Sequence, residues 1–322
     1  MSHLPFISIV TPVYNGAKYL PQCIESALAQ RHDNFEYVIL NNASSDDTGE
    51  IAQRYALRDT RIRVHHNSHT LPLIQNWNRA MSLIAHDSEY TKILHADDTI
   101  YPECLTKMSA LGERHPEIGI IGTPRLRGTY VECSGLPAGQ ERFEGREIAR
   151  LFMRQEIFAF APTSGMIRST LVRGRNPEFY PVDYLHGDLA AYFELLADHD
   201  FGYLDEVLSF SRVHPDSITV TVAQRKQTIF REWLGMLHHY GPRYFEKAEL
   251  KAIERAFLRR YYRVLVRGWV TGRDREFFDY HLQGLRDAKR EPDTVDLMRA
   301  TGSEVLATLT QPRKFFRTLK GA

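Results

Sequence analysis

The chain has 322 residues, in which 41 Lys and Arg nearly balance 40 Asp and Glu, giving a formal net charge of +1 at pH 7. No stretch approaches the roughly 18 consecutive apolar residues that span a bilayer, and the first residues lack the basic region of a secretory signal. Three cysteines without CxxC spacing argue against a disulfide framework or a zinc site. We therefore expect a globular protein of ordinary composition in the reducing cytoplasm.

The first hundred residues alternate between two hydrophobic patterns. Short runs rich in β-branched and aromatic residues predict strands at 6–13, 35–40, 61–65 and 90–94. Apolar residues at helical spacing predict helices at 18–30, 44–57 and 73–85. This alternation is typical of a parallel, doubly wound sheet, so the sequence predicts an α/β fold.

Polar loops follow the first, second and fourth predicted strands. Parallel strands end at the same edge of a sheet, where open α/β sheets bind their ligands. The fourth strand leads into Asp97 and Asp98, and His95 projects from the same side as Asp97 because strand residues alternate. Carboxylates suit Mg²⁺ or Mn²⁺, so this stretch predicts a metal site. The alternative is that both acids cap the helix expected after Pro102 or begin a surface loop.

The pattern and the charge both change towards the C-terminus. Beyond residue 220 the sequence is helical almost without interruption to 309, with breaks near 241, 272 and 292. Residues 225–290 carry 16 Lys and Arg against 8 Asp and Glu, whereas residues 1–224 carry 20 against 28. We predict one domain at 1–220 and a helical, basic extension at 221–322 with a different role.

Five motifs follow one another within residues 6–220. They are VTPVYN at 10–15 with YL at 19–20, NNASSDDT at 41–48, HADD at 95–98 with Pro102, Gly187-Asp188, and R-x-H-x-x-S at 212–217. In this order and spacing they resemble the motifs of glycosyltransferase family 2 enzymes. The resemblance implies a GT-A fold, a Rossmann-like and mostly parallel central sheet flanked by helices. It further implies a nucleotide-sugar half at about 1–122 and an acceptor half at about 123–220.

The resemblance also implies roles for individual residues. The residues expected at the nucleotide are Pro12, Tyr14, Asn15, Asn42, Asn78, Arg79, Ala96 and Asp97. A divalent ion, Mn²⁺ or Mg²⁺, is expected on Asp97, Asp98, His95 and His214, and the diphosphate on Arg212 and His214. Asp188 is the expected catalytic base, with His186 as an alternative.

Several of these residues have a structural alternative. Asp188 stands in the first turn of a predicted helix, where the helix dipole alone favours an acid. Tyr14 can pack on the next helix, and Arg212 with His214 can form a surface pair. Asp46 fits either a family position or the start of a helix.

Two positions depart from the family pattern. Asn41 and Asn42 replace two acids, of which the second usually recognises the nucleotide base, and an amide can still donate and accept hydrogen bonds. His95 replaces the first Asp of the DAD motif, and imidazole binds Mn²⁺ better than Mg²⁺.

The resulting hypothesis is a metal-dependent, inverting glycosyltransferase that moves a sugar from a nucleotide donor, first of all a UDP-sugar, to a glycan or lipid-linked hydroxyl in bacterial surface polysaccharide synthesis. One alternative is a degenerate family member that binds a sugar nucleotide or glycan without turnover. A sugar nucleotidyltransferase is a further alternative, but Tyr14-Asn15-Gly16 does not begin a basic, glycine-rich phosphate loop. No nucleic acid is expected, because residues 1–224 are acidic and contain no recognised binding module.

The helical extension suggests contact with a membrane surface. Arg255, Arg259, Arg260, Arg263 and Arg267 alternate with apolar residues, which predicts a helix with a basic face. The last residues add four cations and Phe315-Phe316 without any acid. A peripheral position at the inner face of the membrane is therefore one expectation, and a solvated helix face is the other.

Overall fold

The computed structural model describes residues 4–175, 178–215, 217 and 219–310. The chain divides into two compact units, Met1–Val213 and His214–Ala322. The sequence-based boundary at residue 220, and the functional meaning given to it, stay predictions.

The first unit is built on a mixed sheet. Within the described residues the strand order is β3-β2-β1-β4-β10-β6-β11-β9. Its strands are β1 (Ile7–Val13), β2 (Phe35–Asn41), β3 (Ile62–His66), β4 (Tyr90–Ile93), β6 (Ile118–Gly122), β9 (Arg142–Phe143), β10 (Gly165–Arg168) and β11 (Asp200–Tyr203). The strands β3, β2, β1 and β4 run parallel, so the loops after β1, β2 and β4 lie at one edge.

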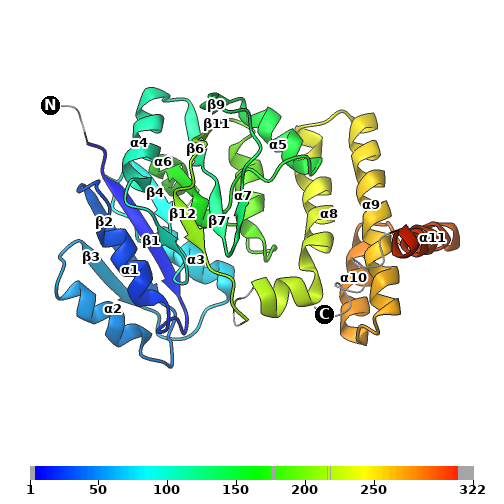
Figure 1. The fold of residues 1–322 in the computed structure, drawn as a ribbon, viewed down its shortest axis with the longest axis horizontal. Coiled ribbons are helices and arrows are strands. Elements are labelled where there is room, and N and C mark those ends of the chain that lie inside the picture. The colour runs from blue at the N-terminus through cyan, green and yellow to red at the C-terminus, as the bar shows by residue number, and fades with distance from the viewer. Residues whose placement is uncertain (1–3, 176–177, 216, 218, 311–322) are drawn as a thin grey trace. The chain divides into compact units, whose positions relative to one another are not determined.

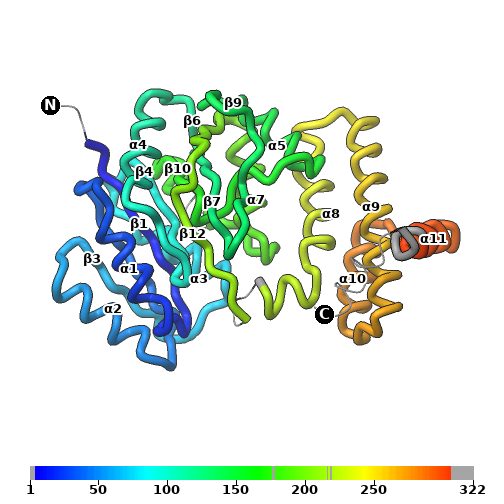
Figure 2. The backbone as a smooth tube through the Cα atoms, in the orientation of Figure 1, coloured from blue at the N-terminus to red at the C-terminus, as the bar shows by residue number. Residues whose placement is uncertain are grey.

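Strand β10 interrupts the parallel order. It lies between β4 and β6 and runs antiparallel to both, although some seventy residues of chain separate it from β4 (Figure 2). Met166 is paired with Lys92 of β4 and with Ile121 of β6. The residues that precede β10 are thereby placed beside the residues that follow β4.

A small second sheet covers the site edge. Its order is β5-β12-β7-β8, formed by β5 (Thr99–Ile100), β12 (Ser209–Ser211), β7 (Arg125–Arg127) and β8 (Tyr130–Glu132). Strand β5 begins directly after Asp98 and pairs with β12. Residues 94–98, here called the acidic loop, are therefore held at both ends, by β4 and by β5.

Helices cover the central sheet (Figure 1). Helices α1 (Leu20–Leu28), α2 (Thr48–Ala56) and α4 (Cys104–Arg114) contribute to one apolar cluster with alternate residues of the strands. Helix α3 (Leu73–Met81) packs against β1 and β2 from the other face. Helices α5 (Gly145–Met153), α6 (Ser169–Arg173) and α7 (Gly187–Leu195) complete the unit, with the short helix η1 (Pro162–Ser164) before β10.

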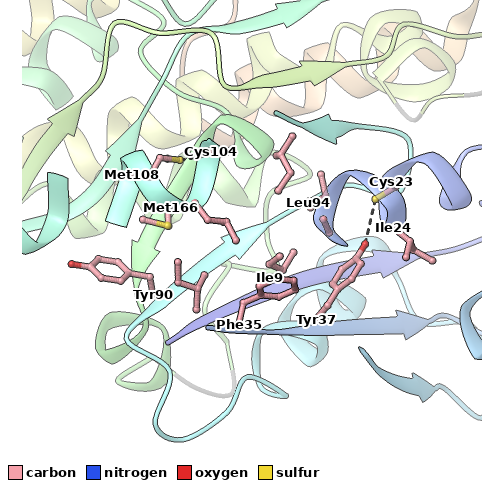
Figure 3. Packing of buried hydrophobic residues seen from close by; sticks show 14 of the residues in the cluster. Ile9, Cys23, Ile24, Phe35, Tyr37, Tyr90, Leu94, Cys104, Met108 and Met166 are labelled. Atoms are coloured by element: carbon pink, nitrogen blue, oxygen red, sulfur yellow. Dashed lines mark hydrogen bonds between the residues drawn. The ribbon is translucent and has the colours of Figure 1, made fainter. Parts of the chain in front are cut away.

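The apolar cluster reaches the end of β4. Figure 3 shows Ile9, Phe35, Tyr37 and Leu94 within it, with the Tyr37 hydroxyl directed at the thiol of Cys23. The Tyr37 hydroxyl oxygen and the Cys23 sulfur are 3.4 Å apart. The Cys23 thiol is also 3.3 Å from the carbonyl oxygen of His95, and burial raises its pKa to about 12. Cys23 is therefore an inert core thiol that fixes the start of the acidic loop.

The second unit is helical in its described residues. It contains η2 (Thr219–Gln224), α8 (Thr228–Tyr240), η3 (Gly241–Arg243), α9 (Lys247–Val270), α10 (Arg275–Asp287) and α11 (Thr294–Thr310). The predicted breaks near 241, 272 and 292 fall between these helices. Buried aromatic residues of α9 and α10, including Phe257, Tyr261 and Phe277, form its core.

The expected basic face of α9 is in part an internal surface. Arg263 and Arg267 both bond to Glu304 of α11, whose side chain is buried. Two of the five arginines therefore hold a neighbouring helix, and Arg255, Arg259 and Arg260 remain on the exposed side. Phe315-Phe316 and the last cations lie outside the described residues. Among the described helices, none has the length and apolar character needed to cross a membrane.

Candidate active site

The loops after β1 and β2 are joined by hydrogen bonds. Asn15, which has a positive φ of 49°, accepts from the Ser45 N–H at 2.9 Å, and its own N–H donates to the Ser44 hydroxyl at 2.9 Å. The Gly16 N–H donates to the Thr48 hydroxyl at 2.8 Å. Asn15 thus shapes the loop, while Tyr14 beside it is exposed and Pro12 is half-buried.

Asp46 stabilises the junction between the loops after β1 and β2. Its carboxylate accepts from the N–H of Ala17 and the N–H of Thr48, both at 3.1 Å. Partial burial acts to raise its pKa, but bonds from the Thr48 hydroxyl and from these N–H groups outweigh burial and lower the pKa. The helix-start interpretation of Asp46 agrees with these contacts.

The acidic loop meets the first loop. A Cβ placed on Gly16 would lie 3.5 Å from the Cβ of Ala96 and only 2.5 Å from a methyl group of Val13. A side chain at position 16 would therefore collide with the end of β1, which explains why glycine stands there. Ala96 and Asp97 are half-buried where these two loops approach each other.

Asp98 is buried and its oxygens are taken up by protein donors. It accepts from the Thr163 hydroxyl at 2.6 Å, the Ser211 hydroxyl at 2.9 Å and the Arg212 N–H at 3.0 Å. Burial raises the pKa of the Asp98 carboxyl, as does the nearby Asp97 charge, against the opposing effects of His95 and the two hydroxyls. Asp98 thus holds the loop together, and its expected role as a metal ligand stays a prediction.

Arg212 clamps the same loop from outside. Its Nε donates to the backbone oxygen of Asp97 at 3.3 Å, and its Nη2 donates to Gln22 at 2.7 Å. The guanidinium lies 4.7 Å from the ring centre of Tyr19. This arrangement places a fixed positive charge beside the acidic loop, and contact of Arg212 with a diphosphate stays a prediction.

His95 stacks on Trp77 of α3, with ring centres 4.8 Å apart and an angle of 35° between the planes. Trp77 in turn meets the ring of Tyr180 edge-on at 5.6 Å. The Nε2 atom of His95 is buried and finds no hydrogen-bond partner among the described residues. A buried ring nitrogen without a partner is costly, so it points to a ligand at this position.

Asp188 lies in the first turn of α7. Burial raises the pKa of its carboxyl, while the charges of His186 and His95 and the Leu189 N–H act to lower it. The charge of Asp188 also acts on the buried hydroxyls of Tyr180 and Tyr192, whose pKa values are raised mainly by burial. The candidate base and the acidic loop therefore share one electrostatic environment through His95.

Two asparagines expected at the nucleotide bind backbone instead. The Asn42 amide donates to the Leu71 carbonyl at 2.9 Å and accepts from the Leu71 N–H at 2.8 Å. Asn78 binds Tyr180 in the same two-bond manner, at 2.8 and 2.7 Å. Asn67 adds a third bond to the Asn42 oxygen at 2.6 Å. Both side chains are buried and bonded to backbone groups, which leaves few amide donors or acceptors for a ligand.

Arg79 and His214 are the remaining residues expected at the site. Arg79 is exposed on α3, and its charge contributes, after burial and Arg63, to the lowered pKa of His65 in β3. His214 is the first residue of the helical unit and stays a predicted ligand only.

Within the described part of the chain, no three His, Cys, Asp or Glu side chains are arranged to hold a metal ion. The four expected ligands therefore do not form a complete protein cage. Mg²⁺ and Mn²⁺ sites with one or two protein ligands are completed by water and substrate phosphate. Asp97 and the unpartnered Nε2 of His95 fit that kind of incomplete site.

Sequence reasoning missed three residues that shape this edge, namely Lys92, Thr163 and Ser211. The sequence signal for Lys92 is a lysine within a predicted buried strand. Thr163 and Ser211 carry no signal of their own, because their importance depends on the position of β10 and β12 beside the acidic loop.

A mixed sheet in which β3, β2, β1 and β4 run parallel, with helices on its faces and polar loops at one edge, defines a GT-A type of fold. Residues 8–172 match the family described as Glycosyl transferase family 2. The chain therefore belongs to that family.

Curated relatives align with limited parts of the chain. The glycosyltransferase GlyG of Streptococcus pneumoniae serotype 4 is 35% identical over 94 residues, 29% of this chain and 31% of that protein. The putative glycosyltransferase EpsE of Bacillus subtilis is 32% identical over 127 residues, 39% of this chain and 45% of that protein. The alignments span less than half the length of these relatives.

Solved structures share the fold. Residues 1–349 of S. aureus TarS, in complex with UDP-GlcNAc, superpose with a TM-score of 0.65 at 17% identity, covering 88% of this chain and 80% of that one. The mannosyltransferase PcManGT from Pyrobaculum calidifontis, in complex with GDP-Man and Mn²⁺, gives a TM-score of 0.59 at 14% identity, covering 99% and 84%. At these identities the likeness establishes the fold alone, and it confirms the predicted α/β architecture.

Proposed function

We propose that this chain transfers a sugar from a nucleotide-sugar donor to an acceptor hydroxyl. One observation carries the proposal: His95 of the acidic loop packs on Trp77, Trp77 meets Tyr180, and Gly187, the residue before Asp188, lies against Tyr180. The acidic loop and the candidate base are thereby brought close together. Glycosyl transfer needs both functions, since charge develops on the leaving diphosphate while the acceptor loses a proton. The ligands named for TarS and PcManGT, UDP-GlcNAc and GDP-Man, support a nucleotide sugar as the donor class.

The donor would lie against the joined loops after β1 and β2. Pro12 and exposed Tyr14 offer surfaces for the nucleotide, and Ala96 and Asp97 border them. Asn42 would act there indirectly, by fixing the backbone at Leu71. A UDP-sugar is the donor we propose first, and the complex of PcManGT with GDP-Man makes a GDP-sugar the competitor.

A divalent ion would be held by Asp97 with His95 and by the donor's own phosphate oxygens. Bound there, such an ion would stabilise the charge of the leaving diphosphate. The imidazole at position 95 favours Mn²⁺ over Mg²⁺. Arg212, fixed by Gln22 and by the Asp97 carbonyl, would add a positive charge beside the same phosphates.

Asp188 would remove the acceptor's proton. Its raised pKa makes the carboxylate a stronger base than a solvated aspartate. Direct attack by an acceptor activated in this way inverts the anomeric centre, so we propose an inverting transfer. The acceptor would be a glycan or lipid-linked hydroxyl of a cell-surface polysaccharide, with the enzyme in the cytoplasm or at the inner membrane face.

The proposal is tested by thermal unfolding of the wild type and of Asp97→Ala with UDP, GDP, dTDP and CDP, each with and without Mn²⁺. A ligand present at a hundredfold excess over its Kd stabilises the folded state by about 2.7 kcal/mol. We expect one nucleotide to raise the unfolding temperature in a Mn²⁺-dependent way, and Asp97→Ala to abolish the shift. The absence of a shift with every nucleotide would contradict the proposal. A shift without turnover on any acceptor would favour the degenerate, ligand-binding alternative.

A further inference from the structure

Lys92 is an unusual residue for the middle of a central strand. Its side chain is fully buried within β4. Lysine is almost never fully buried in proteins, because its ammonium group must lose its water shell. Among the described residues Lys92 has no ion-pair partner, so its acceptors must be neutral groups.

Those acceptors belong to the turn that precedes β10. The Nζ atom of Lys92 donates to the carbonyl oxygens of Thr163 at 2.6 Å and Gly165 at 3.1 Å. The sulfur of Met108 is a third neighbour at 3.8 Å. Lys92 therefore fixes the backbone of η1 and the start of β10 relative to β4.

Thr163 passes this constraint on to the acidic loop. Its hydroxyl donates to Asp98 at 2.6 Å and lies 3.5 Å from the His95 N–H. The Ser211 hydroxyl and the Arg212 N–H hold the same carboxylate from the β12 side. The Asp98 N–H closes the turn on the His95 carbonyl at 3.0 Å. The turn that presents Asp97 is thus anchored through Asp98 to two elements distant in sequence.

A general contribution to stability does not account for this arrangement. Thr91, the preceding residue of β4, is equally buried and bonds to Ser169 at 2.8 Å on the opposite face of the sheet. That contact ties the strand to α6 without reaching the acidic loop. An apolar side chain at position 92 would serve packing at lower cost, so the ammonium is used for the turn it holds.

We propose that Lys92 and Thr163 are positioning residues that fix the turn 95–98, so that Asp97 faces the donor diphosphate. This inference rests on the proposed function for its consequence in catalysis, but its structural part is independent of that function. A catalytic group displaced by about 1 Å can lose roughly a hundredfold in rate. The chain gains a preformed acidic turn before any ligand arrives.

The experiment compares Thr163→Val, Thr163→Ser and Lys92→Met with Thr91→Val as the matched control. Thr163→Val keeps the shape and removes the hydroxyl, whereas Thr163→Ser retains it. The first readout is amide hydrogen exchange of residues 95–99 in the protein without ligand. We expect exchange at the Asp98 amide to be at least about tenfold faster in Thr163→Val and Lys92→Met, and unchanged in Thr163→Ser and Thr91→Val.

The second readout is transfer activity, with kcat and KM for the donor determined separately. We expect kcat/KM to fall roughly 10- to 100-fold in Thr163→Val and Lys92→Met, and to stay within about threefold of wild type in Thr163→Ser and Thr91→Val. Unchanged exchange at 95–99 in Thr163→Val would overturn the inference whatever the activity. An equal loss of activity in Thr91→Val would also overturn it, because the effect would then be one of general stability. If the wild type itself transfers no sugar, the proposed function fails, and the exchange data alone decide the inference.

Discussion

Both compact units bury carboxylates, but they give them different partners. In the helical unit, Glu254 is bonded to Arg290 at 2.7 Å and to His238 at 2.6 Å, and Glu304 bonds to two arginines. In the α/β unit, Asp98 is held by hydroxyls and a backbone N–H, and Asp188 by the Leu189 N–H and the influence of histidines. Asp98 and Asp188 therefore differ from the paired acids of the helical unit, and also from Glu36 of their own unit, which is buried and paired with Arg63.

The pKa values move in opposite directions as a result. For Glu254, burial acts to raise the pKa, but bonds from Arg290 and His238 outweigh it and lower the value. For Asp98 and Asp188, burial dominates and the pKa is raised. Glu254 and Glu304 bond directly to arginine side chains, whereas the hydrogen bonds to Asp98 come from two hydroxyls and a backbone N–H. A metal ion at the acidic loop, or the acceptor's proton at Asp188, would meet the charge of these site acids in the proposed reaction.

The largest expected effect comes from removing the candidate base. Asp188→Asn keeps the shape of the side chain but cannot accept a proton, so we expect kcat to fall roughly 10²- to 10⁴-fold. The Mn²⁺-dependent rise in unfolding temperature, which reports nucleotide binding, should be the same as in the wild type. Glu254→Gln, a buried acid of the helical unit, is the matched control and should retain kcat. A similar loss in both variants would remove the distinction between the two kinds of acid.

A pH titration separates the units next. His281 of α10 is fully buried, with Nδ1 2.8 Å from the Tyr261 hydroxyl and Nε2 2.9 Å from the Lys226 carbonyl. The carbonyl can only accept, so Nε2 donates and the neutral ring accepts at Nδ1. Burial lowers the His281 pKa from 6.5 to about 4.

The sign of the effect follows from proton binding. Above pH 6.5 the ring is neutral in both states and contributes no pH dependence. As the pH falls towards 4, the unfolded chain binds a proton that the folded unit rejects, so stability decreases, by about 3 kcal/mol in total. Denaturant unfolding of the full chain between pH 7 and 4 measures this. His281→Phe should flatten the dependence, and an unchanged slope in that variant would assign the effect to other groups.

The paired acids of the helical unit give a smaller effect. Glu304→Gln leaves Arg263 and Arg267 without a carboxylate, but both arginines are more than a third exposed and can turn towards water. We therefore expect a loss of only about 1–2 kcal/mol in the free energy of unfolding. Glu276→Gln, which breaks the exposed pair with Lys226, is the control and should cost less than about 0.5 kcal/mol. Equal costs would mean that burial of Glu304 has no influence.

Much of the fold was predictable because it depends on local patterns. The alternation of strands and helices over the first hundred residues is set by side-chain periodicity, and it gives the parallel sheet and the position of its site edge. The antiparallel insertion of β10 between β4 and β6 was not predictable, since a four-residue strand carries no information about partners far along the chain. The same reason hid the contact between Thr163 and Asp98.

The site was predictable to the level of motifs but not of contacts. The position of Asp97 and Asp98 after a buried strand indicates an acidic turn, yet nothing in adjacent acids tells which one faces inward. Asp98 takes the buried role because β12 brings Ser211, and η1 brings Thr163, within hydrogen-bond distance of its carboxylate. Likewise the basic residues of α9 could not be divided into exposed and paired ones before α11 was placed against Arg263 and Arg267.

The smallest expected effect concerns the hydrogen bonds between Asn42 and the backbone of Leu71. Asn42→Asp restores the acid typical of the family, but the new carboxylate oxygen would face the Leu71 carbonyl in place of an N–H donor. Because the other oxygen still accepts from Leu71 and Asn67, we expect a loss of about 1 kcal/mol in the free energy of unfolding. Asn41→Asp is the matched control, since its oxygen keeps the Ser44 N–H and its second oxygen can accept from His66 in the tautomer that carries its hydrogen on Nδ1. If Asn42→Asp instead leaves stability unchanged and strengthens nucleotide binding, position 42 recognises the base directly.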